Sequence, residues 1–342
     1  MSTWKFSAIG LLAFAAATVA TAQDSLVDLV RAGQREAALT AITAPGIDIN
    51  AAEPDGATAL HWATYTVDHE LVRALLKAGA KADITNRYGS SPLAEAVKLG
   101  DLELVRMLLD AGANPNSPNQ DQQTALMLAA NIGWLEVAKL LIDRGADVNV
   151  IESFRGQTAL MWAAAENHPD IVELLITKGA EVSLRAVHDD WPRQMTSEPR
   201  AQFRDTGGLT ALLYATRSGC YRCAVAIVEA GGDVDQPNPD GITPLINALD
   251  NKSFDIAMYL LDKGARADVW DMSGRTPIYV AVDMNSFTAR GFGGFGGTPA
   301  PRDPVDVTAM EVVLRLLGMG VDVNHQLTRM RPNGVGRGRF AD

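Results

Sequence analysis

Short blocks of the chain place their apolar residues at helical spacing, with polar residues on the other side. Residues 69–79, HELVRALLKAG, put Leu71, Val72 and Leu75 on one face of a helix. Gly79 then ends this helix, because glycine readily adopts the left-handed backbone conformation that closes a helix. The shorter block before it begins with Thr58, whose hydroxyl is placed to cap the first turn of a helix. The pattern therefore predicts pairs of short amphipathic helices.

The same pair of blocks recurs along the chain with a nearly constant period. The motif GATALHWA begins at Gly56 and returns as GSSPLAEA, QQTALMLA, GQTALMWA, GLTALLYA, GITPLINA and GRTPIYVA, with its Thr or Ser at positions 58, 91, 124, 158, 210, 243 and 276. A second motif, KAGAKAD at Lys77, keeps phase with it as far as GMGVDVN at Gly318. A unit of about 33 residues cannot bury its apolar face alone, so the core must run continuously between neighbouring units. We expect that core to contain Leu60, Leu75, Leu93, Leu108, Leu126, Leu140, Leu160 and Leu174.

These two motifs, seven times in phase, resemble the ankyrin repeat over residues 25–324. The resemblance implies an all-α repeat solenoid, in which each repeat has a β-turn finger and two antiparallel helices. It also implies a non-catalytic chain that binds other proteins through a concave face of fingers and inner helices. We expect a degenerate N-terminal repeat at 25–52 and further repeats near 53–85, 86–116, 117–149, 150–183, 206–235, 236–269 and 270–324.

Two insertions break the period, at 184–205 and at 284–305. The first contains Trp191 and Arg193, and exposed aromatic and Arg side chains are typical of binding hot spots. It is placed to overhang the concave face, or else it is a solvated loop.

The second insertion contains RGFGGFGGTP, which satisfies the G-x-G-x-x-G pattern of phosphate-binding loops. The TPAPRDP that follows would interrupt the helix that such a loop must open, so we read no cofactor site there.

The expected contact surface combines finger tips with the exposed ends of inner helices. Aromatic and Arg side chains on rigid elements suit a protein partner, although tip residues also vary freely when nothing binds them. The candidate residues are Tyr65, Arg87, Tyr88, Lys98, Phe154, Arg155, Glu166, Trp191 and Arg193.

The N-terminus has the pattern of a secretory signal peptide. Lys5 precedes an apolar run that ends in Ala20-Thr21-Ala22, an A-x-A cleavage site, so we expect cleavage between Ala22 and Gln23 and removal of residues 1–22. The run is short for a membrane anchor, which is the alternative. The mature chain is then expected in the bacterial periplasm or outside the cell, with no membrane span.

The net charge and the two cysteines limit the partners and the reactions that this chain can be expected to have. The net charge of -11 disfavours nucleic acid as a partner. Cys220 and Cys223 form a C-x-x-C pair without the His of a haem site and without the βαβ context of a thioredoxin-like site. A local disulfide, two packed thiols, or a catalytic or metal-binding role remain open. The five histidines show no zinc spacing, and we expect neither a metal nor a cofactor.

The tail 325–342 is basic and Gly-rich, and reads as the start of a further repeat or as a disordered end. We expect a monomer unless another chain caps the C-terminal end of the array. The sequence thus favours a protein-binding scaffold. The alternative is a regulatory or accessory segment of a larger periplasmic enzyme or redox system, and a third reading is peptidoglycan or sugar binding at the first insertion.

Overall fold

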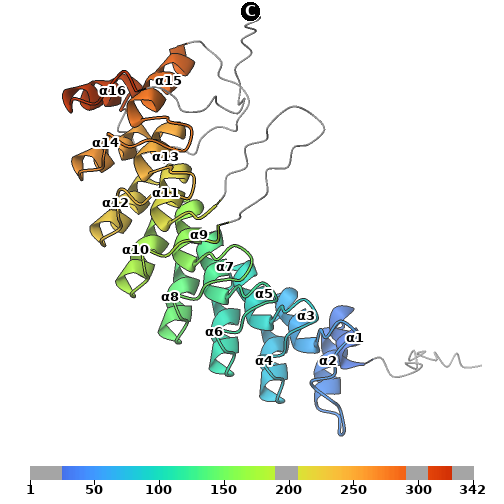
Figure 1. Cartoon of the computed structure of the whole chain (residues 1–342). Coiled ribbons are helices and arrows are strands. Elements are labelled where there is room, and N and C mark those ends of the chain that lie inside the picture. The colour runs from blue at the N-terminus through green and yellow to red at the C-terminus, as the bar shows by residue number, and fades with distance from the viewer. Residues whose placement is uncertain (1–24, 189–206, 290–306, 326–342) are drawn as a thin grey trace, which may run out of the picture.

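The computed structural model describes residues 25–188, 207–289 and 307–325, which form sixteen helices stacked in two layers (Figure 1). The inner layer lies on the concave side of the curved array and contains α1 (Leu26–Arg31), α3 (Ala59–Tyr65), α5 (Pro92–Leu99), α7 (Ala125–Ile132), α9 (Ala159–Ala165), α11 (Ala211–Ser218), α13 (Pro244–Asp250) and α15 (Pro277–Ala289). The outer layer contains α2 (Arg35–Ile42), α4 (His69–Lys77), α6 (Leu102–Asp110), α8 (Leu135–Asp143), α10 (Pro169–Thr177), α12 (Tyr221–Glu229), α14 (Phe254–Asp262) and α16 (Ala309–Gly318). The expected all-α repeat solenoid is confirmed.

The inner helices from α3 to α13 begin directly after the capping Thr or Ser of the motif, as the sequence predicted. The Thr124, Thr158, Thr210 and Thr243 side chains each accept a hydrogen bond from the backbone N–H three residues later, as caps do. Gly79 follows α4 with φ of +95°. Gly133 closes α7 with φ of +97°, and a Cβ there would lie 2.6 Å from the His168 ring of the next repeat. Glycine therefore both ends the helix and lets the next repeat approach.

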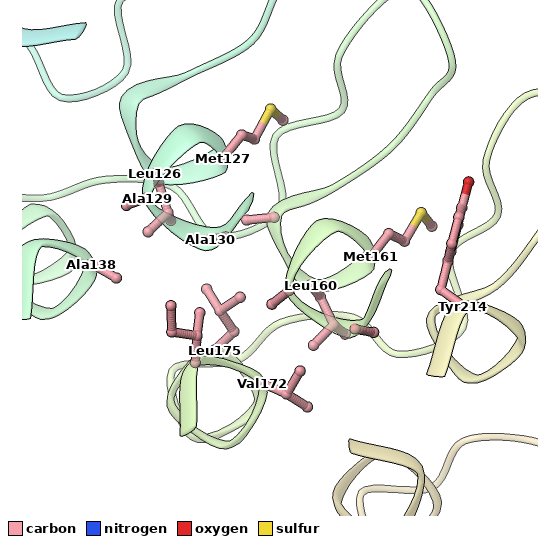
Figure 2. Packing of buried hydrophobic residues seen from close by; sticks show 14 of the residues in the cluster. Leu126, Met127, Ala129, Ala130, Ala138, Leu160, Met161, Val172, Leu175 and Tyr214 are labelled. Atoms are coloured by element: carbon pink, nitrogen blue, oxygen red, sulfur yellow. The ribbon is translucent and has the colours of Figure 1, made fainter. Parts of the chain in front are cut away.

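One continuous core joins the repeats (Figure 2). Leu126 and Leu160 come from neighbouring inner helices and are at most 1 % exposed. Met127 and Met161 project in the same direction from α7 and α9 and are also buried. All but one of the leucines expected in the core are buried; Leu174 is only partly covered, because its position on α10 lies nearer to the outer surface.

Polar contacts fix the register between repeats. The Asn149 side chain donates to the Gly179 carbonyl at 3.0 Å and accepts the backbone N–H of Glu181 at 2.9 Å, and Asn116 makes the equivalent pair of bonds one repeat earlier. An ion pair also links each described outer helix to the next. These pairs are Arg35–Asp68, Arg73–Glu103, Arg144–Asp110, Lys178–Asp143, Arg222–Asp170, Lys263–Glu229 and Arg315–Asp262. At least one partner of each pair is exposed to solvent, and such a pair contributes about 0–1 kcal/mol, so the pairs align the stack more than they stabilise it.

The first insertion begins later than its sequence boundary suggested. Residues 184–188 form an ordinary finger: Ala186 donates its N–H to the Leu209 carbonyl, and His188 bridges to Gly207. Trp191 and Arg193 lie outside the described residues. At the second insertion α15 continues to Ala289 and is longer than the other inner helices, so the first residues of the range expected to be inserted are helical. No helix in the described ranges is long and apolar enough to cross a bilayer.

Candidate functional site

The fingers are braced by their neighbours and by their own side chains. The Val187 N–H donates to the Arg155 carbonyl of the previous finger, and the Met272 N–H donates to the Asp240 carbonyl in the same way. Within a finger, the Glu152 carboxylate accepts the backbone N–H groups of Phe154, Arg155 and Gln157 at 2.6–3.0 Å. These bonds hold the tip backbone in place, so the side chains at the tips project from a rigid support.

Two finger tips present aromatic and Arg side chains to solvent. Tyr88 is 67 % exposed and Phe154 is 69 % exposed. The Arg155 guanidinium lies 5.5 Å from the centre of the Phe154 ring, and Arg87 donates to the Pro54 carbonyl at 2.7 Å. The fingers nearer to the C-terminus differ, because Asp240 and Ser273 at their tips are buried. A pair of an exposed aromatic side chain and a neighbouring Arg at the tip therefore occurs in the N-terminal half and the middle of the array, whereas the last finger exposes Trp270 and Met272, at 55 % and 37 %.

The ends of the inner helices add further exposed groups. Tyr65, at the end of α3, is 61 % exposed and packs edge-on against Trp62, with ring centres 6.1 Å apart. Lys98 is paired with Glu95 at 3.1 Å, and Glu166 is exposed just after α9. The structure thus places Tyr65, Arg87, Tyr88, Lys98, Phe154, Arg155 and Glu166 in solvent, on the finger and inner-helix side. Whether a partner contacts them stays a prediction.

A row of aromatic side chains on the inner helices was missed. Trp62, Trp162 and Tyr214 occupy the same position in their repeats, the fifth residue counted from the capping Thr. Trp62 donates its indole N–H to Glu53 at 2.7 Å, and the Tyr214 hydroxyl accepts from Gln157 at 2.8 Å. The signal was present in the sequence as the W or Y of TALHW, TALMW and TALLY. The sequence does not show which side of such a short helix the neighbouring repeats cover, so it did not show that these side chains form one row.

The Trp162 indole is the exception in this row, because its N–H is buried and has no hydrogen-bond partner in the part of the chain that the structure describes. The equivalent of Glu53 is Glu152, whose oxygens already bind the finger backbone. An unpaired buried donor has a cost of about 1–3 kcal/mol. The aromatic side chain on α9 therefore lacks the hydrogen bond that its equivalent on α3 makes.

Cys220 and Cys223 are joined as a disulfide, with their Cα atoms 5.2 Å apart. Cys220 caps α12, since its sulfur accepts the Cys223 N–H at 3.2 Å, and Cys223 lies inside the first turn. The two residues are 2 % and 0 % exposed. A thiol–disulfide exchange partner must reach a sulfur atom, so a pair buried in this way suits a structural link and not redox catalysis.

Among the described residues, no group of three or more His, Cys, Asp or Glu side chains is placed to hold a metal ion. His61 instead links its own helix cap to the next repeat. Its Nδ1 accepts the Thr58 N–H at 3.2 Å, and its Nε2 lies 3.1 Å from the Ser90 carbonyl of the next repeat. Both bonds are made by the neutral ring with the proton on Nε2.

We expect His61 to make the protein less stable in mild acid. Burial lowers the pKa of His61 below 6.5, and the bond to the Ser90 carbonyl only partly offsets it. Between the two pKa values, the His61 ring binds a proton in the unfolded chain but not in the folded chain. The contribution of His61 to stability is therefore fully present above pH 6.5 and is lost as the pH falls towards the lower pKa of the folded state. Urea unfolding between about pH 7.5 and 5.5 measures this slope. The variant His61→Gln should reduce the slope in this window, and an unchanged slope would assign it to other groups.

Comparison with known proteins agrees with this architecture. Residues 26–119, 111–186 and 212–290 match the family model described as ankyrin repeats (3 copies). No curated protein matches the chain. Ankyrin repeats are generally modules of protein–protein interaction, and the family is typically non-catalytic. With matches over most of its length and eight stacked helix pairs in its described residues, this chain belongs to the ankyrin repeat family.

Proposed function

We propose that this chain is an exported scaffold that binds a protein partner through its finger tips and inner helices, on the concave face of the array. The observation that carries the proposal is the exposure of Tyr65, Tyr88 and Phe154, at 61 %, 67 % and 69 %, on backbone that is already fixed. Large aromatic side chains supply much contact area, and side chains on rigid elements lose little entropy on binding.

A capture experiment with matched variants tests the surface. The mature chain, residues 23–342, is immobilised and exposed to periplasmic extract. Replacing Tyr65, Tyr88 and Phe154 together by Ala is expected to reduce the specifically captured protein by at least about tenfold. Each replacement removes aromatic surface that the bound partner would cover. The matched control replaces Arg73, Arg106 and Lys139 by Ala, three exposed residues of the outer helices. Equal capture by both variants, or no capture above bare resin by the unchanged chain, would refute the proposed surface.

Export is part of the proposal and rests on the N-terminal sequence alone, from Lys5 to the A-x-A site at Ala20–Ala22. The same preparation tests it. The native protein recovered from the periplasmic fraction should begin at Gln23. Recovery from the cytosolic fraction with Met1 or Ser2 at its start would remove export from the proposal.

The alternative, a segment of a periplasmic redox system, draws its support from the C-x-x-C pair. Burial of both cysteines argues against it, since neither sulfur is open to a substrate. Sugar binding would depend on the first insertion, whose Trp191 lies outside the described residues. We therefore keep the scaffold as the proposal.

A further inference from the structure

The arginine side chains of the array differ in whether another group binds them. In the described ranges, every guanidinium donates to a carboxylate or to a backbone carbonyl, with the exception of Arg106, Arg155 and Arg217. Arg106 lies on the outer helix α6, whereas Arg155 lies on a finger and Arg217 on the inner helix α11. All three are exposed. The finger and inner-helix side thus carries two charged groups that the described part of the chain leaves without an acceptor.

Each of these two guanidiniums lies over an aromatic ring. The Arg155 Cζ is 5.5 Å from the centre of the Phe154 ring, and the Arg217 Cζ is 4.9 Å from the centre of the Tyr214 ring. The ring attracts the guanidinium and limits its motion, while the N–H donors in the plane of the group stay available. Glu166 is exposed on the same side, but Arg217 makes no ion pair with it. Both arginines are therefore positioned for an acceptor that comes from outside the chain.

A hydrogen bond joins the surroundings of the two arginines. The Gln157 side chain, two residues after Arg155, donates to the Tyr214 hydroxyl at 2.8 Å, and the Tyr214 ring is the one that supports Arg217. The finger and α11 therefore meet between the two guanidiniums. An extended segment advances about 3.3 Å per residue, so a single short segment of a partner can reach both.

We propose that the partner binds this surface with an acidic segment, whose Asp or Glu carboxylates accept hydrogen bonds from Arg155 and Arg217. The inference rests on the proposed function and names the chemistry of the partner at that surface. A planar guanidinium can donate two parallel N–H bonds to one carboxylate, which adds strength and fixes the orientation. The exposed Phe154 ring offers apolar contact beside the first of these ion pairs. The expected segment therefore carries carboxylates together with apolar or aromatic side chains.

The net charge of -11 does not exclude such a partner. Many of the acidic side chains lie on the outer helices, such as Glu70, Glu103 and Glu136, in the layer away from the concave side (Figure 1). At physiological salt, exposed charges interact little beyond about 8 Å. A short segment with two carboxylates thus meets less repulsion than a nucleic acid, which carries a phosphate at every nucleotide.

Selection from a random peptide library tests this chemistry. The mature chain is immobilised and offered random peptides displayed on phage, and we expect the enriched peptides to contain Asp and Glu in excess over the library. The double variant Arg155→Glu/Arg217→Glu should instead enrich Lys and Arg, because it reverses the charge at both positions. The matched control Arg106→Glu changes the third unpartnered arginine, on the outer layer, and should keep the acidic preference. Circular dichroism confirms that the variants fold.

The affinity for one enriched acidic peptide measures the part of each arginine. Arg155→Gln and Arg217→Gln should each weaken binding by about tenfold or more, because each removes charge-assisted hydrogen bonds, whereas Arg106→Gln should not. Enriched peptides without an excess of acidic residues overturn the inference, as does a lack of any enrichment or an affinity that either inner Gln variant retains. Single-stranded DNA that binds in place of acidic peptides, and is lost in the double variant, would assign the arginines to phosphate groups instead.

The capture experiment with Tyr65, Tyr88 and Phe154 judges the scaffold itself. Capture of a protein that depends on those aromatic residues, together with peptides of no acidic preference, refutes only the inference about the acidic segment. The two proposals can therefore fail separately.

Discussion

Replacing Leu160 by Ala is expected to lower the free energy of unfolding by about 3–5 kcal/mol. Leu160 is 1 % exposed on α9 and lies in the core row that joins neighbouring repeats (Figure 2). The rigid helices around it cannot collapse into the space, so the change leaves a cavity as well as removing buried apolar area. The effect is expected to be large because the position couples the two halves of the array.

Urea unfolding followed by circular dichroism measures this effect. In a solenoid each repeat contacts only its neighbours, so weakening a central interface should also separate the unfolding into two transitions. The control is Leu99→Ala at the exposed end of α5, where the side chain is 41 % exposed and the expected loss is about 1 kcal/mol or less. A loss at Leu160 no larger than that at Leu99 would mean that the core is not continuous through α9.

Replacing Arg275 by Met is expected to lower the free energy of unfolding by about 3–5 kcal/mol. Arg275 is mostly buried between two carboxylates, Asp271 at 2.6 Å and Asp250 at 2.9 Å. Burial opposes the charged guanidinium, but the attraction and hydrogen bonds of both carboxylates outweigh it and raise the pKa of Arg275. Without Arg275 the Asp271 side chain, 3 % exposed, would remain buried with no counter-charge.

The matched control for this change is Arg73→Met. Arg73 pairs with Glu103 at 3.0 Å, but both side chains are more than half exposed, so water replaces the lost contact and the cost is about 1 kcal/mol or less. Urea unfolding at neutral pH compares the two. Similar losses for the two variants would show that burial of the Arg275 ion pairs adds nothing to stability.

The fold was predictable from the sequence because its determinants are local and repeated. Thr158 caps α9, Gly79 ends α4 and Leu160 lies in the core, each as its motif indicated. The position of the first insertion was predicted less well. Residues 184–188 were assigned to it, yet they form a regular finger, because their pairing partners Gly207 to Thr210 lie beyond the insertion and only the folded chain brings them together.

The candidate contact surface was also predictable only in part. The exposed tips Tyr88 and Phe154 followed from the motif phase. The inner aromatic row of Trp62, Trp162 and Tyr214 did not, since which residue of a short helix faces the next repeat depends on how the repeats stack. The burial of both cysteines, which separates a structural link from a reactive pair, is likewise a property of the packing around α12.

The sequence by itself determined the repeat, the helix pairs, their caps and the row of leucines, because each of these depends on residues within one unit and on a period that every unit shares. Only the tertiary structure decided the ion pairs between outer helices, the mostly buried ion pairs of Arg275 and the exposure of Met310, Leu314 and Leu317 on α16. These features depend on contacts between units, or on their absence at the end of the array, and a periodic sequence does not reveal at which interface a side chain finds its partner.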